Sequence, residues 1–333
     1  MNEPVFTCAR CRRDRPASER RSFDDRDYCP RCLDKITTLC HICGARFRLI
    51  DNCGTDAVPL CKTCLDIHNR AGIRDYCHKP RPIFYGSGPR YFGVELEIDD
   101  GGEYDSSANA ILSAANTDRE YIYCKHDGSL DEGLEIVSHP MSVDYHLNAA
   151  PWPEIIDKAL ELGYSSHQAG TCGLHVHVSR AAFGPTEQHQ DAAIARVLYF
   201  FEKHWEELLK FSRRTQKQLD DWASRYGYRS EPKDILDHAK KGNGRGRYSA
   251  VNLTNLDTVE FRMFRGTLKL NTFLATLQLL DRICDVALSM SDSQIKDMSW
   301  TTFVSGCTAP ELVQYLKERR LYVNEPVACE EEV

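Results

Sequence analysis

Four short segments of the sequence carry acidic, histidine or arginine side chains at alternate positions. Side chains of a strand alternate between the two faces of a sheet, so the ionic residues of each segment would share one face and the apolar residues the other. Surface strands normally use Lys, Thr and Ser, whereas these segments place Glu and His between Val, Leu and Phe. The pattern predicts a metal- and anion-binding face on a sheet. The segments are 92–98 (FGVELEI), 133–137 (GLEIV), 172–178 (CGLHVHV) and 259–265 (VEFRMFR).

Four glutamates stand on the predicted face, and two arginines accompany the last of them. Carboxylate oxygens are the hard ligands that Mg²⁺ prefers, and arginine offers phosphate a fixed cation. An ATP-using site needs both, because the metal bridges phosphate oxygens while arginine neutralises charge in the transition state. We therefore interpret the face as a magnesium and nucleotide site. Its residues are Glu95, Glu97, Glu135, Glu260 and Arg262, with Arg265 three positions further along the last segment.

His175 and His177 occupy the same predicted face. They could assist at a metal or a phosphate, or they could be ordinary hydrogen-bonded histidines. A metal held by them with Glu95 and Glu97 would activate water, which makes a metal-dependent hydrolase the alternative function. A nucleophilic role for Cys172 is less favoured, because a small buried cysteine is the commoner case. A merely salt-bridged face is disfavoured by the free-energy cost of burying unpaired carboxylates.

The chain of 333 residues is long enough for about two domains. Its 42% hydrophobic residues and its mean hydropathy of −0.47 are typical of a globular protein. We expect a cytoplasmic protein, because no run approaches the roughly 18 apolar residues of a membrane span and the start lacks a signal-peptide core. Residues 1–80 hold 15 basic against 11 acidic residues and the remainder 27 against 38, which does not favour a dedicated nucleic-acid binder.

Ten of the 15 cysteines lie in the first 77 residues, and eight of those form CxxC pairs. Without an export signal, this pattern indicates zinc rather than disulfides. The second set of four cysteines repeats the first after 32 positions, which indicates a duplicated zinc-ribbon-like or treble-clef-like unit. Each all-cysteine site would hold one structural Zn²⁺, which replaces the core that so small a unit cannot build. The ligands are Cys8, Cys11, Cys29, Cys32, Cys40, Cys43, Cys61 and Cys64.

The repeat favours two sequential zinc sites, because a duplicated unit should fold as a unit. A cross-braced arrangement, in which the first and third CxxC pairs share an ion, is the alternative. Two structural zinc ions would bring stability and a binding surface rather than chemistry. The cluster from Arg10 to Arg21 could form a local basic patch, but a solvated charged loop is the favoured interpretation.

Proline and glycine clusters at 79–82 and 86–89 mark the end of the zinc module. We place the module at 1–78, a linker at 79–90, a catalytic domain at 91–325 and an acidic tail at 326–333. Strands and helices alternate in the catalytic domain, which indicates an α+β fold class. Apolar periodicity and helix-end signals predict helices at 107–115, 153–162, 187–211, 271–289 and 311–320.

The polar segment 213–247 is different, because glycines and basic residues gather near its end. It is predicted as a loop. Such a loop could close over phosphates with backbone donors and mobile cations, or it could be an ordinary flexible surface loop.

The motifs, taken in order, carry a resemblance. They are FGVELE at 92–97, DGSL at 127–130 with GLEIVS at 133–138, CGLHVH at 172–177, and VEFR at 259–262 with FRGTL at 264–268. They resemble the successive motifs of the amidoligase family, carboxylate–amine ligases similar to glutamate–cysteine ligase and glutamine synthetase. The resemblance covers roughly residues 90–290. The zinc module lies outside it as an accessory fusion.

The resemblance implies an antiparallel sheet of the glutamine synthetase and glutamate–cysteine ligase type, with flanking helices, curved around an active site. It also implies a reaction in two steps. ATP would phosphorylate a substrate carboxylate, and an amine would then displace phosphate to give an amide or isopeptide bond.

The resemblance also implies roles for single residues. The four glutamates would hold two or more Mg²⁺ ions, with one of the two histidines assisting. Arg262, Arg265 and Arg247 would contact the phosphates of ATP or of the acyl phosphate. Asp127 and Ser129 would shape the substrate side, or would only form the turn that Asp-Gly-Ser favours.

The leading hypothesis is an ATP- and Mg²⁺-dependent amidoligase whose zinc module recruits a partner, such as the peptide or protein to be modified. Besides the hydrolase, a non-enzymatic zinc-ribbon adaptor with an inactive ligase scaffold is an alternative. The expected partners are a small amine or carboxylate and a peptide or protein, while nucleic acid is not favoured. The sequence leaves the identity of the substrates and the oligomeric state open.

Overall fold

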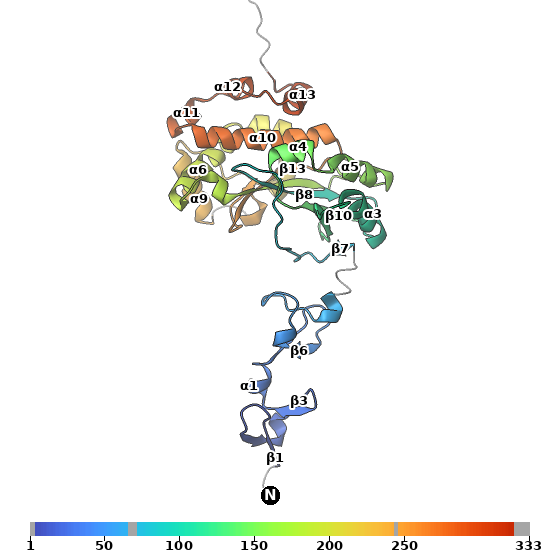
Figure 1. Cartoon of the computed structure of the whole chain (residues 1–333). Coiled ribbons are helices and arrows are strands. Elements are labelled where there is room, and N and C mark those ends of the chain that lie inside the picture. The colour runs from blue at the N-terminus through green and yellow to red at the C-terminus, as the bar shows by residue number, and fades with distance from the viewer. Residues whose placement is uncertain (1–3, 66–71, 243–245, 323–333) are drawn as a thin grey trace, which may run out of the picture. The chain divides into compact units, whose positions relative to one another are not determined.

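The chain forms two compact units that divide between residues 71 and 72 (Figure 1). The computed structural model describes residues 4–65, 72–242 and 246–322. The second unit begins before the boundary expected at 78, because β7 (Ile73–Arg74) pairs with a strand of its sheet. Residues 79–90, expected as a linker, also belong to the second unit, and Tyr85 among them is buried. The expected acidic tail lies outside the described residues.

A seven-stranded sheet forms the centre of the second unit, with the strand order β12-β13-β11-β8-β10-β9-β7. Neighbouring strands are antiparallel, except for the parallel pair of β7 and β9. The α+β class and the antiparallel sheet are therefore confirmed, and each of the four ionic segments forms a strand. The further strands are β8 (Phe92–Ile98), β9 (Ile122–Lys125), β10 (Leu134–Ser138), β11 (Gly173–Ser179), β12 (Val251–Asn252) and β13 (Thr258–Arg265).

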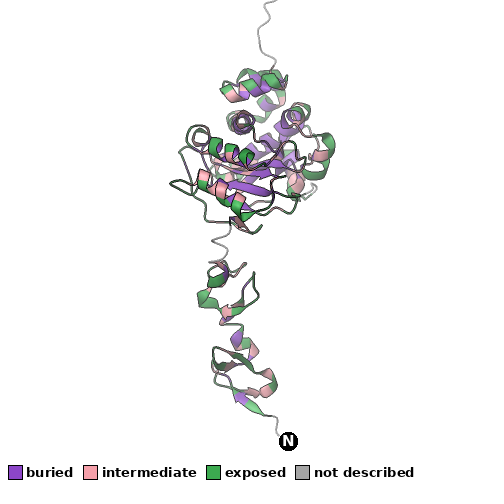
Figure 2. Cartoon of the chain, turned by 90° about the vertical axis from the view of Figure 1, so that its right-hand side faces the viewer, coloured by how far each residue is buried: buried purple, intermediate pink, exposed green. Residues whose placement is uncertain are grey.

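One face of this sheet is apolar and is covered by helices. In Figure 1, α10 (Leu270–Ser289) crosses above β8 and β13, with α6 (Glu187–Lys203) and α5 (Trp152–Glu161) on either side. Val94, Leu96 and Phe261 of the strands are fully buried in one hydrophobic core with side chains of α10 (Figure 2). Burial of this face fixes the register, since a slip of one residue would turn every apolar side chain outward.

The predicted helices are present in the structure, except that His204 divides the one at 187–211 into two. The loop prediction for 213–247 is wrong in part, because the segment contains α8 and α9. A capping box of Thr215 and Gln218 begins α8, and Pro232 stands in the first turn of α9. The remaining helices are α3 (Asp105–Ala115), α4 (Val143–Asn148), α7 (Trp205–Ser212), α8 (Gln216–Trp222), α9 (Pro232–Lys240), α11 (Asp292–Asp297), α12 (Trp300–Ser305) and α13 (Pro310–Glu318).

Within the described ranges, no helix has both the length and the apolar character that crossing a membrane requires.

The first unit repeats its secondary structure with the interval of its cysteines. Its β1 and β2 form an antiparallel pair, and β5 and β6 form the same pair 32 positions later. The pairing of Arg21 with Tyr28 also recurs, as a hydrogen bond from Cys53 N to Leu60 O. The duplication is therefore visible in the backbone. The elements are β1 (Val5–Thr7), β2 (Asp14–Pro16), β3 (Arg21–Phe23), β4 (Arg26–Tyr28), α1 (Pro30–Leu33), β5 (Thr37–Leu39) and β6 (Arg46–Arg48).

The eight CxxC cysteines form two separate clusters. One contains Cys8, Cys11, Cys29 and Cys32 and the other Cys40, Cys43, Cys61 and Cys64, with the sulfur atoms of each cluster within 4.8 Å of one another. The grouping is therefore sequential rather than cross-braced. These clusters could each hold a zinc ion.

Backbone donors prepare the first cysteine of the first cluster for metal binding. Burial raises the pKa of Cys8, but N–H groups of Cys11, Cys29 and Arg10 outweigh it and lower the pKa to about 6. The thiolate, which is the form that binds a metal, is thus favoured at this position. A small core surrounds it, with Phe6, Tyr28 and Leu33 buried.

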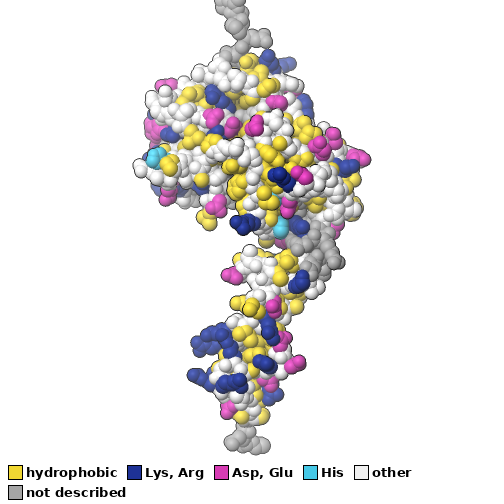
Figure 3. Space-filling model, viewed as in Figure 1, with side chains coloured by type: hydrophobic (Ala, Val, Ile, Leu, Met, Phe, Trp, Pro, Cys, Tyr) yellow, Lys and Arg dark blue, Asp and Glu magenta, His cyan; other side chains and the backbone are white. Residues whose placement is uncertain are grey.

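Basic side chains gather on the surface of the first unit. Arg10, Arg12, Arg13, Arg20 and Arg21 are exposed. Figure 3 shows Lys and Arg side chains close together toward the N-terminal end of this unit, with Asp and Glu side chains beside them. The surface is therefore of mixed charge, with a local excess of cations.

Zinc content tests the sequential grouping. We expect two zinc ions per chain in the wild type and one in the double variant Cys11→Ser/Cys32→Ser, because both cysteines belong to one cluster. In the cross-braced arrangement the same variant would lose both ions. Metal analysis of the purified chain by inductively coupled plasma mass spectrometry distinguishes these results. The double variant Cys43→Ser/Cys64→Ser, made in the other cluster, is the matched control and should also retain one ion.

Candidate functional site

The register of the sheet brings the predicted ionic residues together on the face opposite the helices. β8 lies between β10 and β11, and β13 lies on the far side of β11. Residues that are far apart in the sequence therefore become direct cross-strand neighbours. The directly opposed pairs are Glu97 with Glu135, Glu95 with His175, and His177 with Glu260.

A β-bulge in β13 decides where Arg265 lies. Strict alternation would put Arg265 on the apolar face, because it follows Arg262 by three positions. The register between β11 and β13 shifts within the strand, however, and both Met263 and Phe264 are buried in the core. Arg265 consequently comes opposite Gly173, on the face that carries Arg262.

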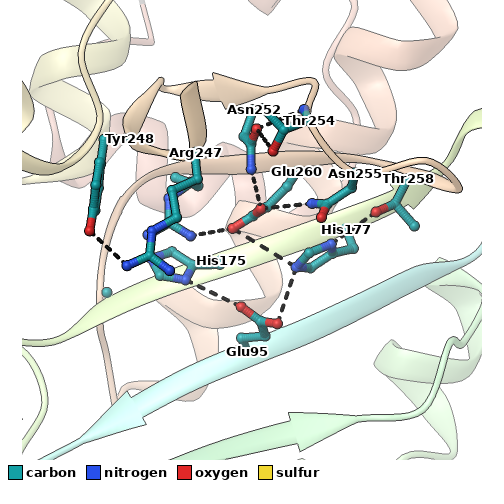
Figure 4. A network of polar contacts seen from close by, with 12 residues as sticks. Glu95, His175, His177, Arg247, Tyr248, Asn252, Thr254, Asn255, Thr258 and Glu260 are labelled. Atoms are coloured by element: carbon teal, nitrogen blue, oxygen red, sulfur yellow. Dashed lines mark hydrogen bonds and ion pairs between the residues drawn. The ribbon is translucent and has the colours of Figure 1, made fainter. Parts of the chain in front are cut away.

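Glu95 lies between the two histidines of β11 (Figure 4). Its Oε2 is 3.4 Å from His175 Nδ1 and its Oε1 is 3.3 Å from His177 Nε2. Burial raises the pKa of Glu95, but His177 and His175 outweigh it and hold the pKa well below its usual range. Burial lowers the pKa of His177, and the Glu95 carboxylate more than reverses this, so the pKa is raised. Glu95 is therefore an ionised carboxylate.

Glu260 is held in place by one asparagine at the end of β12 and another in the loop between β12 and β13. Its Oε2 accepts hydrogen bonds from Asn252 Nδ2 at 2.8 Å and Asn255 Nδ2 at 2.9 Å. Its Oε1 is paired with Arg262 and lies 4.0 Å from His177 Nε2. One oxygen is thus fixed by amides and the other faces the histidine. Neither asparagine was predicted, because no spacing in the sequence links them to Glu260.

Lys125 provides the counter-charge on the other side of the face. It stands opposite Glu135 on β9, and its Nζ lies 3.2 Å from Glu135 Oε2. Burial and the nearby Glu95 carboxylate raise the pKa of Glu135 well above its usual range, against the opposing effect of Lys125. Negative charge is therefore in excess here, which favours a bound cation. Lys125 was not predicted, because only the register reveals its partner.

Asp127 joins the carboxylates and also forms a turn. Its Oδ1 accepts hydrogen bonds from Ser129 N and Ser129 Oγ, each at 2.7 Å. This is the turn expected of Asp-Gly-Ser. A carboxylate oxygen of Asp127 also forms a group of possible metal ligands with oxygens of Glu97 and Glu135. Ser129 contributes only to the turn in these contacts.

Three overlapping groups of side chains could hold metal ions. Within each group the candidate ligand atoms lie within 4.8 Å of one another. His175 Nδ1 and His177 Nε2 are buried without a hydrogen-bond partner, although each lies near a carboxylate. Carboxylate-rich sets of this kind suit a hard divalent cation, and two shared members would allow neighbouring ions. The groups are Glu95 with His177 and Glu260, Glu95 with Glu135 and His175, and Glu97 with Asp127 and Glu135.

The predicted arginines come from two different segments. Arg262 pairs with Glu260 and keeps a buried Nε without a hydrogen-bond partner. Arg247 lies in the 3-10 turn Gly246–Tyr248, where it donates to the hydroxyl groups of Tyr76 and Tyr248, each at 2.7 Å. Its guanidinium lies over the Tyr248 ring, 4.8 Å from the centroid. Arg262 is thus fixed on the sheet, whereas Arg247 is an exposed side chain held by tyrosines.

Gly173 leaves a space in which three functional groups meet. A Cβ at this position would lie 2.6 Å from Arg214 Nη2, 2.7 Å from His175 Nε2 and 3.3 Å from Glu97 Oε2. The backbone N–H of Gly173 donates to Glu97. Burial lowers the pKa of Arg214 to about 10, against the effect of Glu97 and together with Arg262 and Arg265. Arg214 was missed, because an arginine after a helix is ordinary surface composition.

Asp99, directly after β8, organises the loops beside the site. Its Oδ1 accepts from the backbone N–H of Glu132 at 2.7 Å and its Oδ2 from that of Asp131 at 3.1 Å. Thr171 Oγ1 donates to the same carboxylate at 2.7 Å. Burial raises the pKa of Asp99, but these hydrogen bonds outweigh it and hold the pKa below its ordinary value of 3.8.

A family model described as "Putative amidoligase enzyme" matches residues 110–284, which is more than half of the chain. The matched span contains β10, β11 and β13, and it begins after β8. The comparison with curated proteins gives no match.

Replacing Asp99 should loosen the loops that it organises. We expect Asp99→Asn to lower the free energy of unfolding by about 1–3 kcal/mol, because buried backbone donors lose an ionised acceptor. The lowered pKa means that the wild type loses this advantage as the pH falls through the folded-state value, below 3.8. Urea unfolding at pH 7 and at pH 3 measures both effects. Asp100→Asn, at an exposed neighbouring position, is the control, and an equal loss there would contradict the assignment.

Proposed function

Because the chain belongs to the amidoligase family, we propose that it is an ATP- and Mg²⁺-dependent carboxylate–amine ligase that forms an amide or isopeptide bond through an acyl phosphate. The observation that carries this proposal is the joining of carboxylates and arginines on one face of the sheet. The antiparallel sheet with helices on its other face also supports a fold of the glutamine synthetase and glutamate–cysteine ligase type.

The proposed reaction has two displacement steps. In the first, an oxygen of the substrate carboxylate bonds to the γ-phosphorus of ATP while the bond from that phosphorus to the bridging oxygen breaks, which releases ADP. In the second, the amine nitrogen bonds to the acyl carbon while the bond from that carbon to the phosphorylated oxygen breaks. Phosphate leaves, and it takes up the proton that the amine loses. Both steps need charge neutralisation more than a nucleophilic side chain.

The residues of the face have complementary roles in this proposal. Mg²⁺, when bound, would offset the negative charge of the phosphates. Its ligands would be Glu95, Glu97, Glu135 and Glu260, with Asp127 and one of His175 and His177 beside them. The asparagines that hold Glu260 and the lysine that pairs with Glu135 would keep these ligands oriented.

The arginines would act on the phosphates. Arg262, fixed by Glu260 next to the carboxylates, is suited to the transferring phosphoryl group. Arg265 lies on the same face two strands from Glu97, and Arg247 would approach from the 3-10 turn. Ser129 and Asp127 would border the substrate side through their turn.

The first unit would recruit a partner or substrate. Four-cysteine sites fix its fold without taking part in chemistry, and its exposed arginines offer a surface of local positive charge. A peptide or protein that carries acidic residues would suit this surface. In this proposal the first unit serves the ligase reaction and has no separate function. The ligase would act in the cytoplasm.

One observation favours a second candidate, a metal-dependent hydrolase. Two of the three ligand groups contain a histidine, and His–carboxylate sets also hold metals that activate water. This candidate leaves Arg262 and Arg265 without a substrate group to neutralise, so we rank it below the ligase.

Removing one carboxylate should abolish the ligase activity. We expect Glu95→Gln to reduce the release of ADP and phosphate by about 100-fold or more in a panel of acids and amines, because a charged ligand in each of two groups is lost. The release in the wild type should require both an acid and an amine. The control is Glu132→Gln, at an exposed position shortly after the turn formed by Asp127 and Ser129. This variant should keep full activity. Undiminished activity in a folded Glu95→Gln chain would contradict the site assignment.

Thermal shift measurements separate the two candidates. Mg²⁺ with the non-hydrolysable nucleotide AMP-PNP should raise the melting temperature, since a ligand at 100 times its Kd stabilises the native state by about 2.7 kcal/mol. The shift should need both components and should be lost in Arg262→Ala. A shift produced by Mn²⁺ alone, unchanged by the nucleotide, would favour the hydrolase.

A further inference from the structure

A pocket of about 680 Å³ with a strongly basic lining lies beside the candidate site. Its side chains come from α7 and the two residues after it, from the residue after α13, from the last residue of β13 and from the segment before β11. Five of the eight lining residues are permanent cations and one is an acid. They are His167, Glu206, Leu209, Lys210, Arg213, Arg214, Arg265 and Arg319.

The cations of the pocket have no acidic partners among the described residues. None of the five lies within 4.0 Å of a carboxylate oxygen there, whereas other basic residues of this unit are paired, such as Lys269 with Glu318 at 2.9 Å and Arg196 with Asp292 at 3.1 Å. In addition, the Nε of Arg265 is buried without a hydrogen-bond partner. Uncompensated guanidinium groups that converge on one cavity favour a bound anion.

Two of the five cations, Lys210 and Arg319, donate hydrogen bonds to carbonyl groups at helix ends, which accounts for their presence. Arg319 donates two hydrogen bonds to the carbonyl oxygen of Lys210, at 3.0 and 2.8 Å, and Lys210 Nζ donates to the carbonyl oxygen of Arg320 at 3.2 Å. Basic side chains commonly satisfy carbonyl groups at helix C-termini. Arg213, Arg214 and Arg265 satisfy no helix-end carbonyl among the described contacts, although Arg213 neighbours the Tyr315 hydroxyl and Arg214 is attracted by Glu97, so the inference rests on these three.

Arg213 adopts a backbone conformation that is costly for an arginine. It follows α7 with a φ of 62°, in the left-handed region that glycine or asparagine usually occupies at a helix end. Arg12 and Arg320 share this conformation outside the pocket, so the backbone by itself does not account for an arginine here, whereas the side chain of Arg213 lines the pocket.

The electrostatic field in the pocket is positive. Burial, together with the positive charges of Arg213, Arg265 and Arg319, lowers the pKa of His167 to about 4. His167 is therefore neutral at pH 7 and can exchange a hydrogen bond with an anion without adding charge.

Arg214 links the pocket with the carboxylate face. Arg214 lines the pocket, and its Nη2 also reaches the space at Gly173 where His175 and Glu97 meet. An anion in the pocket would therefore contact Arg214, which also lies beside the candidate metal ligands His175 and Glu97. A nucleotide base is a poorer occupant, because Leu209 is the only apolar side chain in the described lining.

We propose that this pocket binds a second anionic group of the substrate acid, so that the substrate is a compact polyanion with two or more carboxylate or phosphate groups. The inference rests on the proposed function, since it assumes that one carboxylate of that acid is activated at the neighbouring face. Arg213, Arg214 and Arg265 neutralise the second group and hold it in place, and Glu206 at the exposed rim disfavours acids that reach too far.

Binding measurements on the full chain test the proposal. The probes are tricarballylate, which has three carboxylates, inorganic phosphate, butyrate as a single carboxylate, and Mg²⁺ with AMP-PNP, all at one ionic strength in isothermal titration calorimetry. Arg213→Asn removes a pocket cation and suits the left-handed backbone. Arg320→Asn is the matched control, because Arg320 also has a positive φ, of 54°, and is exposed outside the pocket lining. Arg213→Gly, which also removes the cation and suits the left-handed backbone, serves as a second pocket variant if Arg213→Asn does not fold.

The proposal expects tricarballylate or phosphate to bind the wild type and Arg320→Asn, and to bind the pocket variant at least about tenfold more weakly, a loss of about 1.4 kcal/mol. Tighter binding of tricarballylate indicates a polycarboxylic acid, and tighter binding of phosphate indicates a phosphorylated acid. Butyrate should not bind measurably, and AMP-PNP should bind all chains equally.

Three results would overturn the proposal. They are no binding of either polyanion to the wild type, equal binding to the pocket variant, and a loss of AMP-PNP binding in the pocket variant, which would assign the pocket to the nucleotide. If AMP-PNP binds none of the chains while the polyanion results hold, the ligase proposal fails and the anion site stands.

Discussion

Charge compensation among buried carboxylates is the constraint on which the rest of the second unit depends. Glu95, Glu97 and Glu135 are brought close together by the antiparallel register, and like charges at this depth repel strongly. The sheet offsets them with groups on every side, namely the histidines of β11, Lys125 on β9 and the Arg262 beside Glu260. A bound divalent cation would offset the remaining negative charge, so the arrangement of the face favours cation binding.

The four site strands could be predicted because their two faces differ so strongly in polarity. Alternation alone places Glu95 with Glu97 and His175 with His177 on one face. Helices cover the other, apolar face, which is why the strands alternate in polarity. The bulge was not predicted, although the apolar doublet of Met263 and Phe264 interrupts the alternation and was its signal. Partners such as Lys125 and Asn252 could not be found, since only strand pairing brings them to their carboxylates.

Local signals explain the success in the first unit and the failure in the segment 213–247. The two cysteine clusters and the repeated strands follow from spacings within 32 residues. In the segment, polar composition favoured a loop, yet the capping box at Thr215 and the first-turn Pro232 marked two helices. Short-range signals at helix ends were therefore more informative than average polarity.

Both edges of the sheet are short, and this limits how a macromolecular substrate could be recognised. The edge strands β7 and β12 contain two residues each, and β7 runs parallel to its neighbour. Such edges offer few free backbone groups for an added strand. A peptide cannot be aligned here by β-augmentation along its backbone. It would have to present a terminus or a single side chain end-on to the carboxylate face, which makes recognition depend on that one group and on a docking surface elsewhere.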